Sequence, residues 1–230
     1  MRKKAFKAAL PMTIPVLTGY LFIGIAFGIL ANSNGYHLGW ILLMSTFIFA
    51  GSMQFVAISL LASGFNILSV ILITIMINAR HLFYGLSMLD RFKNMGKKKP
   101  YMIFSLTDET FSLLCGVDPP GGVNKDWFYF YIALLNHIYW ILGSLVGGLL
   151  GSLITFNTQG IEFVMTALFV VIFLDQWEKN KDHSPAIIGI LSSIICLIIF
   201  RAENFILPSM ILIMTLLLIF KTTIRLEDEQ

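Results

Sequence analysis

Long, nearly uncharged apolar runs constrain this chain more than any other feature of its sequence. A helix that crosses a bilayer needs about 20 mostly apolar residues. Such runs follow one another along almost the whole chain, with short polar connectors between them. The candidate segments are 11–31, 39–62, 66–88, 101–116, 127–153, 160–177, 184–200 and 203–221. The sequence therefore predicts an all-α, polytopic transmembrane bundle with about seven to eight hydrophobic segments.

Composition supports lipid as the main solvent of this chain. Hydrophobic residues make up 57% of the sequence and charged residues only 13%, whereas a soluble domain carries about 25% charged residues. We expect a single membrane domain over residues 1–230. Met44-Ser45-Thr46-Phe47 resembles Met165-Thr166-Ala167-Leu168-Phe169, and each stretch follows closely spaced glycines. This predicts an internal repeat with halves 1–120 and 121–230, as many transporters have.

Two basic clusters bear on topology. The N-terminal basic cluster is Arg2, Lys3, Lys4 and Lys7, and the second basic cluster is Arg91, Lys93, Lys97, Lys98 and Lys99. Both flank apolar segments, which favours topology determinants over nucleic-acid binding. Basic loops stay in the cytoplasm, so an even number of crossings is expected between the clusters. One of the first three segments is then broken or re-entrant.

The best candidate for that break is segment 39–62. Its middle reads FAGSMQF, in which Gly51, Ser52 and Gln54 are unusual for a helix that faces lipid. Irregular backbone at membrane depth is tolerated only where it is buried in protein or lines a cavity. We therefore expect the break near Gly51 and Ser52, beside a polar site.

Polar side chains at the end of segment 66–88 form a second candidate site. Asn78 and His81 share one helix face, while Arg80 and Tyr84 share another. Ionisable groups inside lipid are costly and are functional candidates by default. Two readings remain open: Arg80 snorkels to the headgroups, or Asn78, Arg80 and His81 line a polar path.

Acidic residues mark two more places. Asp108 and Glu109 are adjacent in the short segment 101–116, and either is able to pair with Arg80, bind substrate or carry a proton. Asp175 ends an apolar run, where an interfacial cap is the competing interpretation. The pair Asn136-His137 lies inside segment 127–153, where a lone histidine is more often a hydrogen-bonded packing residue than a ligand.

Glycines at four-residue spacing predict close helix packing. They are Gly24 and Gly28 in the first segment, and Gly143, Gly147 and Gly151 in the fifth. Enzyme signatures are missing, because the chain has no HExxH, phosphate-binding glycine loop or CxxC motif. The histidines His37, His81, His137 and His183 are scattered, so we expect no catalytic residues, no metal and no cofactor.

Five short motifs stand in order along the chain: GIAFG at 24–28, FAGSMQF at 49–55, NARH at 78–81 with Tyr84-Gly85, TDE at 107–109 and FLDQW at 173–177. Their order and spacing resemble the AzlC family over nearly the whole chain. The FAGSxQF and NARH motifs are the distinctive ones. The glycine pairs alone would be weak evidence for this resemblance.

The resemblance implies a multi-pass permease of the cell inner (plasma) membrane that exports branched-chain amino acids together with a small AzlD-like membrane subunit. Because no ATP-binding motif is present, the driving force would be a gradient. Alternatives from other classes are a channel-like pore or uptake permease for small amphipathic solutes, and a membrane scaffold whose polar residues only hold helices together.

A zwitterionic substrate needs partners for its carboxylate, its ammonium group and its apolar side chain. Amides of the broken helix or Arg80 are candidates for the carboxylate, and Phe49, Met53 and Phe55 for the apolar pocket. We expect substrate binding at Ala50, Gly51, Ser52, Gln54, Phe55, Asn78, Arg80 and His81, and ammonium binding, proton or ion coupling, or ion pairing at Asp108, Glu109 and Asp175.

Overall fold

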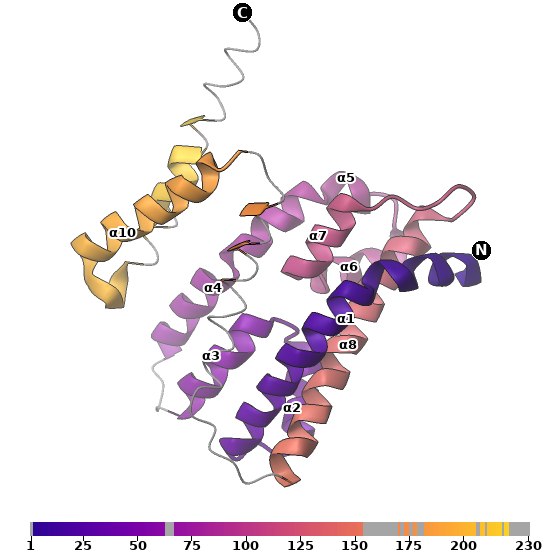
Figure 1. Cartoon of the computed structure of the whole chain (residues 1–230), viewed down its shortest axis with the longest axis horizontal. Helices are drawn as coiled ribbons and strands as arrows, with labels where there is room; N and C mark the ends of the chain where they lie inside the picture. The colour runs from indigo at the N-terminus through magenta and orange to yellow at the C-terminus, as the bar shows by residue number, and fades with distance from the viewer. Residues whose placement is uncertain are drawn as a thin grey trace, which may run out of the picture. The chain divides into compact units, whose positions relative to one another are not determined.

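The structure is a computed structural model in which the described elements are all helices (Figure 1). It describes residues 2–62, 67–153, 170, 173–174, 177–178, 182–205, 208–209, 211–217 and 219–220, without the side chains of 62, 69, 72, 76, 79, 83 and 202–204. The chain divides into two compact units, Met1–Thr166 and Ala167–Gln230. The all-α prediction is confirmed for the described residues.

Two long helices form the centre of the first unit. Helix α1 spans Arg2–Ser33 and α8 spans Lys125–Leu153, and they lie side by side (Figure 1). At about 1.5 Å per residue, each exceeds the roughly 30 Å of a bilayer core. In the described part of the chain, these two helices and Ser184–Arg201 are long and apolar enough to cross a membrane.

Glycines bring α1 and α8 into backbone contact. A Cβ atom added to Gly24 would lie 2.9 Å from the Ser144 amide nitrogen, and one added to Gly143 would lie 2.7 Å from the Tyr20 carbonyl oxygen. Cβ atoms added to Gly28 or Gly147 would overlap backbone atoms of the facing helix. The predicted close packing is confirmed, since hydrogen atoms at these positions are what let the two backbones approach.

The segment predicted at 39–62 is two helices. Helix α2 spans Leu38–Phe47 and α3 spans Gly51–Ala62, and residues 48–50 between them are not α-helical. The interruption therefore comes immediately before Gly51-Ser52, and Gly51 begins α3. Phe49 has a φ of 41°, which is sterically disfavoured for a residue with a side chain. That conformation turns the chain out of α2.

The rest of the first unit contains one long and several short helices. They are α4 (Ile67–Ser87), α5 (Leu89–Phe92), the 3₁₀ helix η1 (Gly96–Lys98), α6 (Lys99–Phe104) and α7 (Asp108–Gly116). The expectation of one helix over 101–116 was wrong, because residues 105–107 interrupt it. Thr107 caps α7 by accepting the Thr110 amide at 3.3 Å, and two acids in the first turn favour a helix start there.

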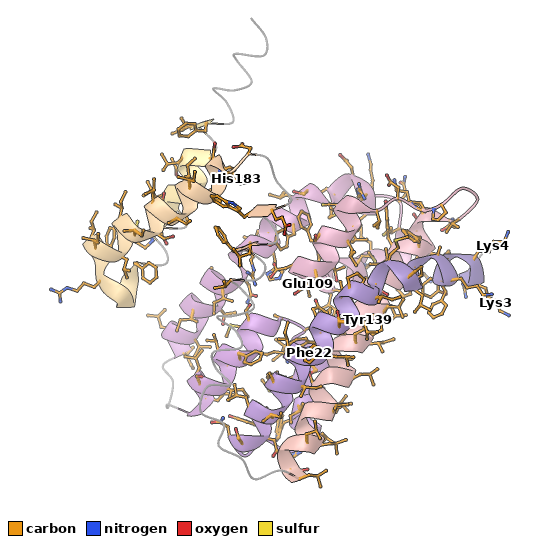
Figure 2. All side chains as sticks on the ribbon, in the orientation of Figure 1. Lys3, Lys4, Phe22, Glu109, Tyr139 and His183 are labelled. Atoms are coloured by element: carbon orange, nitrogen blue, oxygen red, sulfur yellow. The ribbon has the colours of Figure 1, made fainter. Side chains whose placement is uncertain are left out.

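The two basic clusters meet at one end of the first unit. The Arg2 guanidinium carbon lies 4.3 Å from the centre of the Trp127 ring. The Lys98 ammonium nitrogen lies 4.3 Å from the same ring centre and 3.8 Å from the Asp126 carboxylate. Lys3 and Lys4 extend from this end of α1 (Figure 2). The N-terminal and second basic clusters are therefore on the same side of the unit.

The second unit contains α10, Ser184–Asn204. Arg201 interrupts its regular geometry with a φ of 60°. Residues 211–217 are helical, within the predicted segment 203–221. Most of the predicted segment 160–177, with Asp175, lies outside the described residues. The count of seven to eight segments and the internal repeat stay predictions.

Candidate functional site: a cavity beside the α2–α3 break

A cavity of about 280 Å³ lies in the first unit beside the break between α2 and α3. The break and α3 form one wall, α4 a second, and α6 with the residues after it a third. Its lining residues are Ile48, Phe49, Ala50, Met53, Thr74, Asn78, His81, Gly85, Ile103, Phe104 and Leu106. Most of these side chains are apolar, and the polar ones all come from α4.

The polar wall on α4 has a defined hydrogen-bonding pattern. The Asn78 side-chain amide donates to the Thr74 carbonyl oxygen at 3.0 Å. The His81 Nδ1 atom lies 3.2 Å from the Asn78 carbonyl oxygen, so Nδ1 carries the hydrogen of that bond. In the neutral imidazole, Nε2 is then an acceptor. Asn78 Oδ1 and His81 Nε2 are thus acceptors on this wall, together with the Thr74 hydroxyl oxygen.

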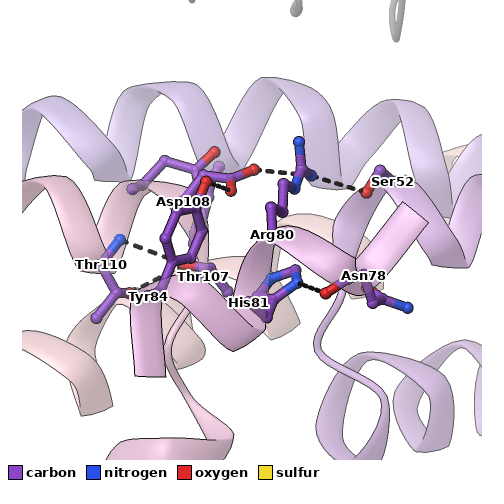
Figure 3. A network of polar contacts seen from close by, with 10 residues as sticks. Ser52, Asn78, Arg80, His81, Tyr84, Thr107, Asp108 and Thr110 are labelled. Carbon is purple, nitrogen blue, oxygen red and sulfur yellow. Dashed lines mark hydrogen bonds and ion pairs between the residues drawn. The ribbon is translucent and has the colours of Figure 1, made fainter. Parts of the chain in front are cut away.

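Arg80, one residue before His81, belongs to a different network (Figure 3). Its Nη2 atom lies 2.8 Å from Asp108 Oδ2 and donates to the Ser52 hydroxyl at 3.1 Å. Tyr84 donates to Asp108 Oδ1 at 2.7 Å. The predicted pairing of an acid with Arg80 is present, and Asp108 is the acid. Neither Arg80 nor Asp108 lines the cavity.

Phe49 forms part of the cavity wall and reaches deep into the unit. Its buried ring stacks on His137 with 4.2 Å between ring centres and meets Tyr20 edge-on at 6.4 Å. His137 is hydrogen-bonded at both ring nitrogens, to the Tyr101 hydroxyl at 3.0 Å and the Ser45 carbonyl oxygen at 3.3 Å. His137 is therefore a packing residue that supports Phe49, as its lone position predicted.

A second buried network runs from α7 to α8 by way of α1. The Tyr20 hydroxyl donates to Glu109 Oε2 at 2.7 Å and also lies 2.7 Å from the Thr107 hydroxyl. Thr107 contacts the Thr110 hydroxyl at 3.0 Å, and the Asn136 amide donates to Thr110 at 3.0 Å. In Figure 2, Glu109 lies beside α1. Glu109 is thus separate from the Arg80–Asp108 pair in its contacts.

Three more residues predicted for the site contact aromatic side chains elsewhere in the unit. Gln54 is buried and accepts a hydrogen bond from the Trp140 indole at 2.9 Å. Gly51 faces the Trp140 ring, which a Cβ atom would approach to 3.2 Å. Phe55 packs on Phe27 with 5.6 Å between ring centres. Of the predicted substrate-binding residues, Ala50, Asn78 and His81 line the cavity, whereas Gly51, Ser52, Gln54, Phe55 and Arg80 do not.

Sequence reasoning missed Tyr20 and Thr110. Each reads as an ordinary residue of an apolar segment, and the two hydroxyls become notable only when the fold brings them together with Thr107, a residue of the TDE motif. Asn136 was singled out as polar in an apolar segment, which is the signal that pointed toward this network. In the described part of the chain, no group of three His, Cys, Asp or Glu side chains converges as a metal site.

The long apolar helices, their glycine contacts and the buried polar networks define an α-helical membrane protein. The family model described as "AzlC protein" matches residues 15–154. The Bacillus subtilis protein named "Branched-chain amino acid transport protein AzlC" is 48% identical over 217 residues, which cover 94% of this chain and 85% of that protein. This chain belongs to the AzlC family.

Other relatives carry less specific names. An "Uncharacterized membrane protein" of Helicobacter pylori strain J99 is 48% identical over 218 residues, covering 95% of this chain and 96% of that protein. The "Inner membrane protein YgaZ" of Escherichia coli K12 is 26% identical over 192 residues, covering 79% and 78%. No solved structure matches the chain.

Proposed function

We propose that this chain exports branched-chain amino acids across the plasma membrane and that the cavity beside the α2–α3 break is its substrate site. The cavity carries the proposal. It lies at a helix interruption, it has one polar wall, and its other walls are apolar. The substrate class is proposed from the Bacillus subtilis relative, which is named as a branched-chain amino acid transport protein.

Size and lining suit a small amphipathic solute. The volume of about 280 Å³ lies just below the roughly 300–1,000 Å³ of pockets for drug-sized ligands, as an amino acid requires. Met53, Ile103 and Phe104 offer apolar contact for a branched side chain, while Asn78 and His81 offer hydrogen bonds. Such a lining is compatible with leucine, isoleucine and valine, whose side chains differ in size by no more than one methylene group.

The charged ends of the substrate have distinct partners in this proposal. The amide of Met53, a cavity-lining residue in the first turn of α3, has no intrahelical acceptor and sits at the positive end of the helix dipole. It receives the carboxylate, as the ends of broken helices do in other transporters. Asn78 Oδ1 and His81 Nε2 accept from the ammonium group. Arg80 and Asp108 hold the helices around the site instead of binding substrate.

We further propose that α2 and α3 form a re-entrant pair. With 10 and 12 residues, each is about 15–18 Å long, half a bilayer core. A re-entrant pair leaves α1 and α4 as the crossings between the two basic clusters. That even number agrees with the contact of both clusters with Trp127. The cavity would then lie at mid-membrane depth.

The direction, the driving force and the partner come from the family resemblance. Export, a gradient as energy source and a small AzlD-like subunit are therefore parts of the proposal. The chain has no ATP-binding motif, which supports a gradient. Alternating access to the cavity distinguishes this function from a channel-like pore, which needs an open path.

Flux of labelled leucine from proteoliposomes tests the function. The purified chain is reconstituted with and without the AzlD-like subunit, and efflux is followed with and without an imposed pH gradient. We expect saturable efflux that isoleucine and valine inhibit and glutamate does not. Efflux that rises linearly with leucine concentration would indicate a pore. Absence of leucine flux under all conditions would contradict the proposed substrate.

A further inference from the structure

The donor directions in the hydrogen-bond network around Glu109 depend on whether Glu109 carries a proton. Four oxygen-bearing groups form a row: the Glu109 carboxyl and the hydroxyls of Tyr20, Thr107 and Thr110. Neighbouring oxygens are 2.7, 2.7 and 3.0 Å apart. Each contact needs one hydrogen. With Glu109 ionised, the three hydroxyls supply the three hydrogens required.

Ionised Glu109 fixes the direction of the row. Tyr20 donates to Glu109 at 2.7 Å, so ionised Glu109 requires Thr107 to donate to Tyr20 and Thr110 to donate to Thr107. This is the reverse of the direction that the 3.0 Å Thr107–Thr110 contact has in the structure, where Thr107 is the donor. The Thr110 oxygen then accepts the Asn136 side-chain N–H at 3.0 Å. In this state every hydroxyl points toward α7 and its carboxylate.

A proton on Glu109 reverses the row. Glu109 then donates to Tyr20, Tyr20 to Thr107, and Thr107 to Thr110, the last contact having a geometry suited to Thr107 as donor. The Thr110 hydrogen is left without an acceptor in the row. Asn136 supplies one when its amide group turns over, because Asn136 Oδ1 is buried without a hydrogen-bond partner in the described residues.

We propose that Glu109 is the proton-binding residue of this transporter, and that its protonation reverses the Tyr20–Thr107–Thr110 hydroxyl row and turns the Asn136 amide in α8. One proton enters from water and binds the carboxylate. The hydroxyls only rotate, and no O–H bond breaks. The coupling of this event to leucine movement rests on the proposed function; the proton site itself does not.

Glu109 is better suited to this task than its neighbour. Asp108 is held by Arg80 at 2.8 Å and by Tyr84 at 2.7 Å. In the described residues, no cation lies within ion-pair distance of Glu109, whose carboxyl contacts a neutral phenol. Burying a carboxylate without a cation is costly, and a proton removes that cost.

Groups from α1, α4, α7 and α8 surround the Glu109 carboxyl. The ionisable groups that face Glu109 in the described part of the chain are Tyr20 on α1, Asp108 on α7, and Arg80 and Tyr84 on α4. Helix α8 contributes the neutral Asn136, and the adjacent His137 is bonded to Tyr101 and Ser45. Asp108 forms an ion pair with Arg80, whereas the Glu109 carboxyl contacts the neutral Tyr20 hydroxyl.

Phe49 links the row to the proposed substrate cavity. It lines the cavity, and its ring meets Tyr20 edge-on at 6.4 Å between ring centres. Leu106, which precedes Thr107, also lines the cavity. Tyr20 and Thr107 are therefore each next to a residue of the cavity wall.

Infrared difference spectroscopy on the purified protein tests the proton site without any transport. Acidification should produce the carbonyl band of a protonated, buried carboxylic acid. Glu109→Gln should abolish this band, Asp108→Asn should leave it, and Tyr20→Phe should shift it. Tyr139→Phe is the matched control, because Tyr139 is a buried tyrosine of the same helix pair bonded to Thr13 at 3.0 Å. A band that survives Glu109→Gln, or that Tyr20→Phe and Tyr139→Phe affect equally, would overturn the assignment.

Leucine flux then tests the coupling. A pH gradient should accelerate leucine flux by the wild-type protein about tenfold, which is within the usual range of coupling between two sites. Glu109→Gln should lose this acceleration. Leucine binding should persist, because Glu109 does not line the cavity. An intact infrared assignment with unchanged gradient dependence in Glu109→Gln overturns the coupling alone. Absent leucine flux in wild type overturns the proposed function and leaves the proton site standing.

Discussion

The Arg80 guanidinium lies 2.8 Å from the Asp108 carboxylate and joins the middle of α4 to the first turn of α7. Ser52 at the start of α3 accepts a further hydrogen bond from the same nitrogen. One cation therefore holds three helices together, of which α3 and α4 border the cavity. This arrangement makes the pair a structural clamp around the site.

The clamp predicts an unequal response to two neutralising substitutions. Asp108→Asn removes the carboxylate that both Arg80 and Tyr84 contact and should lower the free energy of unfolding by about 1–3 kcal/mol, somewhat below the cost for fully buried pairs. Asp126→Asn is the control, because its partner Lys98 is 3.8 Å away, against 2.8 Å between Arg80 and Asp108, and ion pairs without ideal geometry contribute about 1 kcal/mol or less. Thermal unfolding in detergent measures both. Equal losses would contradict the clamp.

The glycine contacts predict a position-specific intolerance of methyl groups. Gly28→Ala places a Cβ atom against the α8 backbone, which should cost about 1–3 kcal/mol or more through overpacking. Gly19→Ala is the matched control in α1, because nothing lies within 4 Å of its added Cβ atom. Monomer yield and thermal stability in detergent should fall only for Gly28→Ala.

The contacts with Trp127 predict that both basic clusters face the cytoplasm. Single cysteines at Lys3 and Lys97, in a background without Cys115 and Cys196, should react with a membrane-impermeant maleimide only after the cytoplasmic side is opened. Labelling of one position from outside the intact cell and of the other from inside would separate the clusters. The re-entrant course of α2 and α3 would then be wrong.

Much of this architecture is encoded in local patterns. Hydropathy predicted a helical membrane protein, and four-residue glycine spacing predicted the contact between α1 and α8. The polar residues of FAGSMQF predicted the position of the helix break to within a few residues. Helical periodicity also separated Asn78 and His81 from Arg80 and Tyr84, and these pairs do lie in different networks.

Other features depend on tertiary contacts that no local pattern reports. The break lies at Phe49 because stacking on His137 and contact with Tyr20 hold that residue at a disfavoured φ. Sequence alone did not reveal which of two adjacent acids would meet Arg80. In the sequence, Tyr20 is an aromatic residue of an apolar helix, and only the fold shows that its hydroxyl donates a hydrogen bond to Glu109.

Leucine binding to protein with a filled cavity is the most direct test of the central claim. Gly85 lines the cavity, and nothing lies within 4 Å of a Cβ atom added there, so Gly85→Leu adds bulk to the cavity without a backbone clash. Gly19→Leu adds the same bulk at an equally open position outside it. Equilibrium binding of labelled leucine should weaken about tenfold or more in Gly85→Leu, which corresponds to about 1.4 kcal/mol, and should stay unchanged in Gly19→Leu. Wild-type affinity in a folded Gly85→Leu protein would contradict the assignment of the cavity as the substrate site.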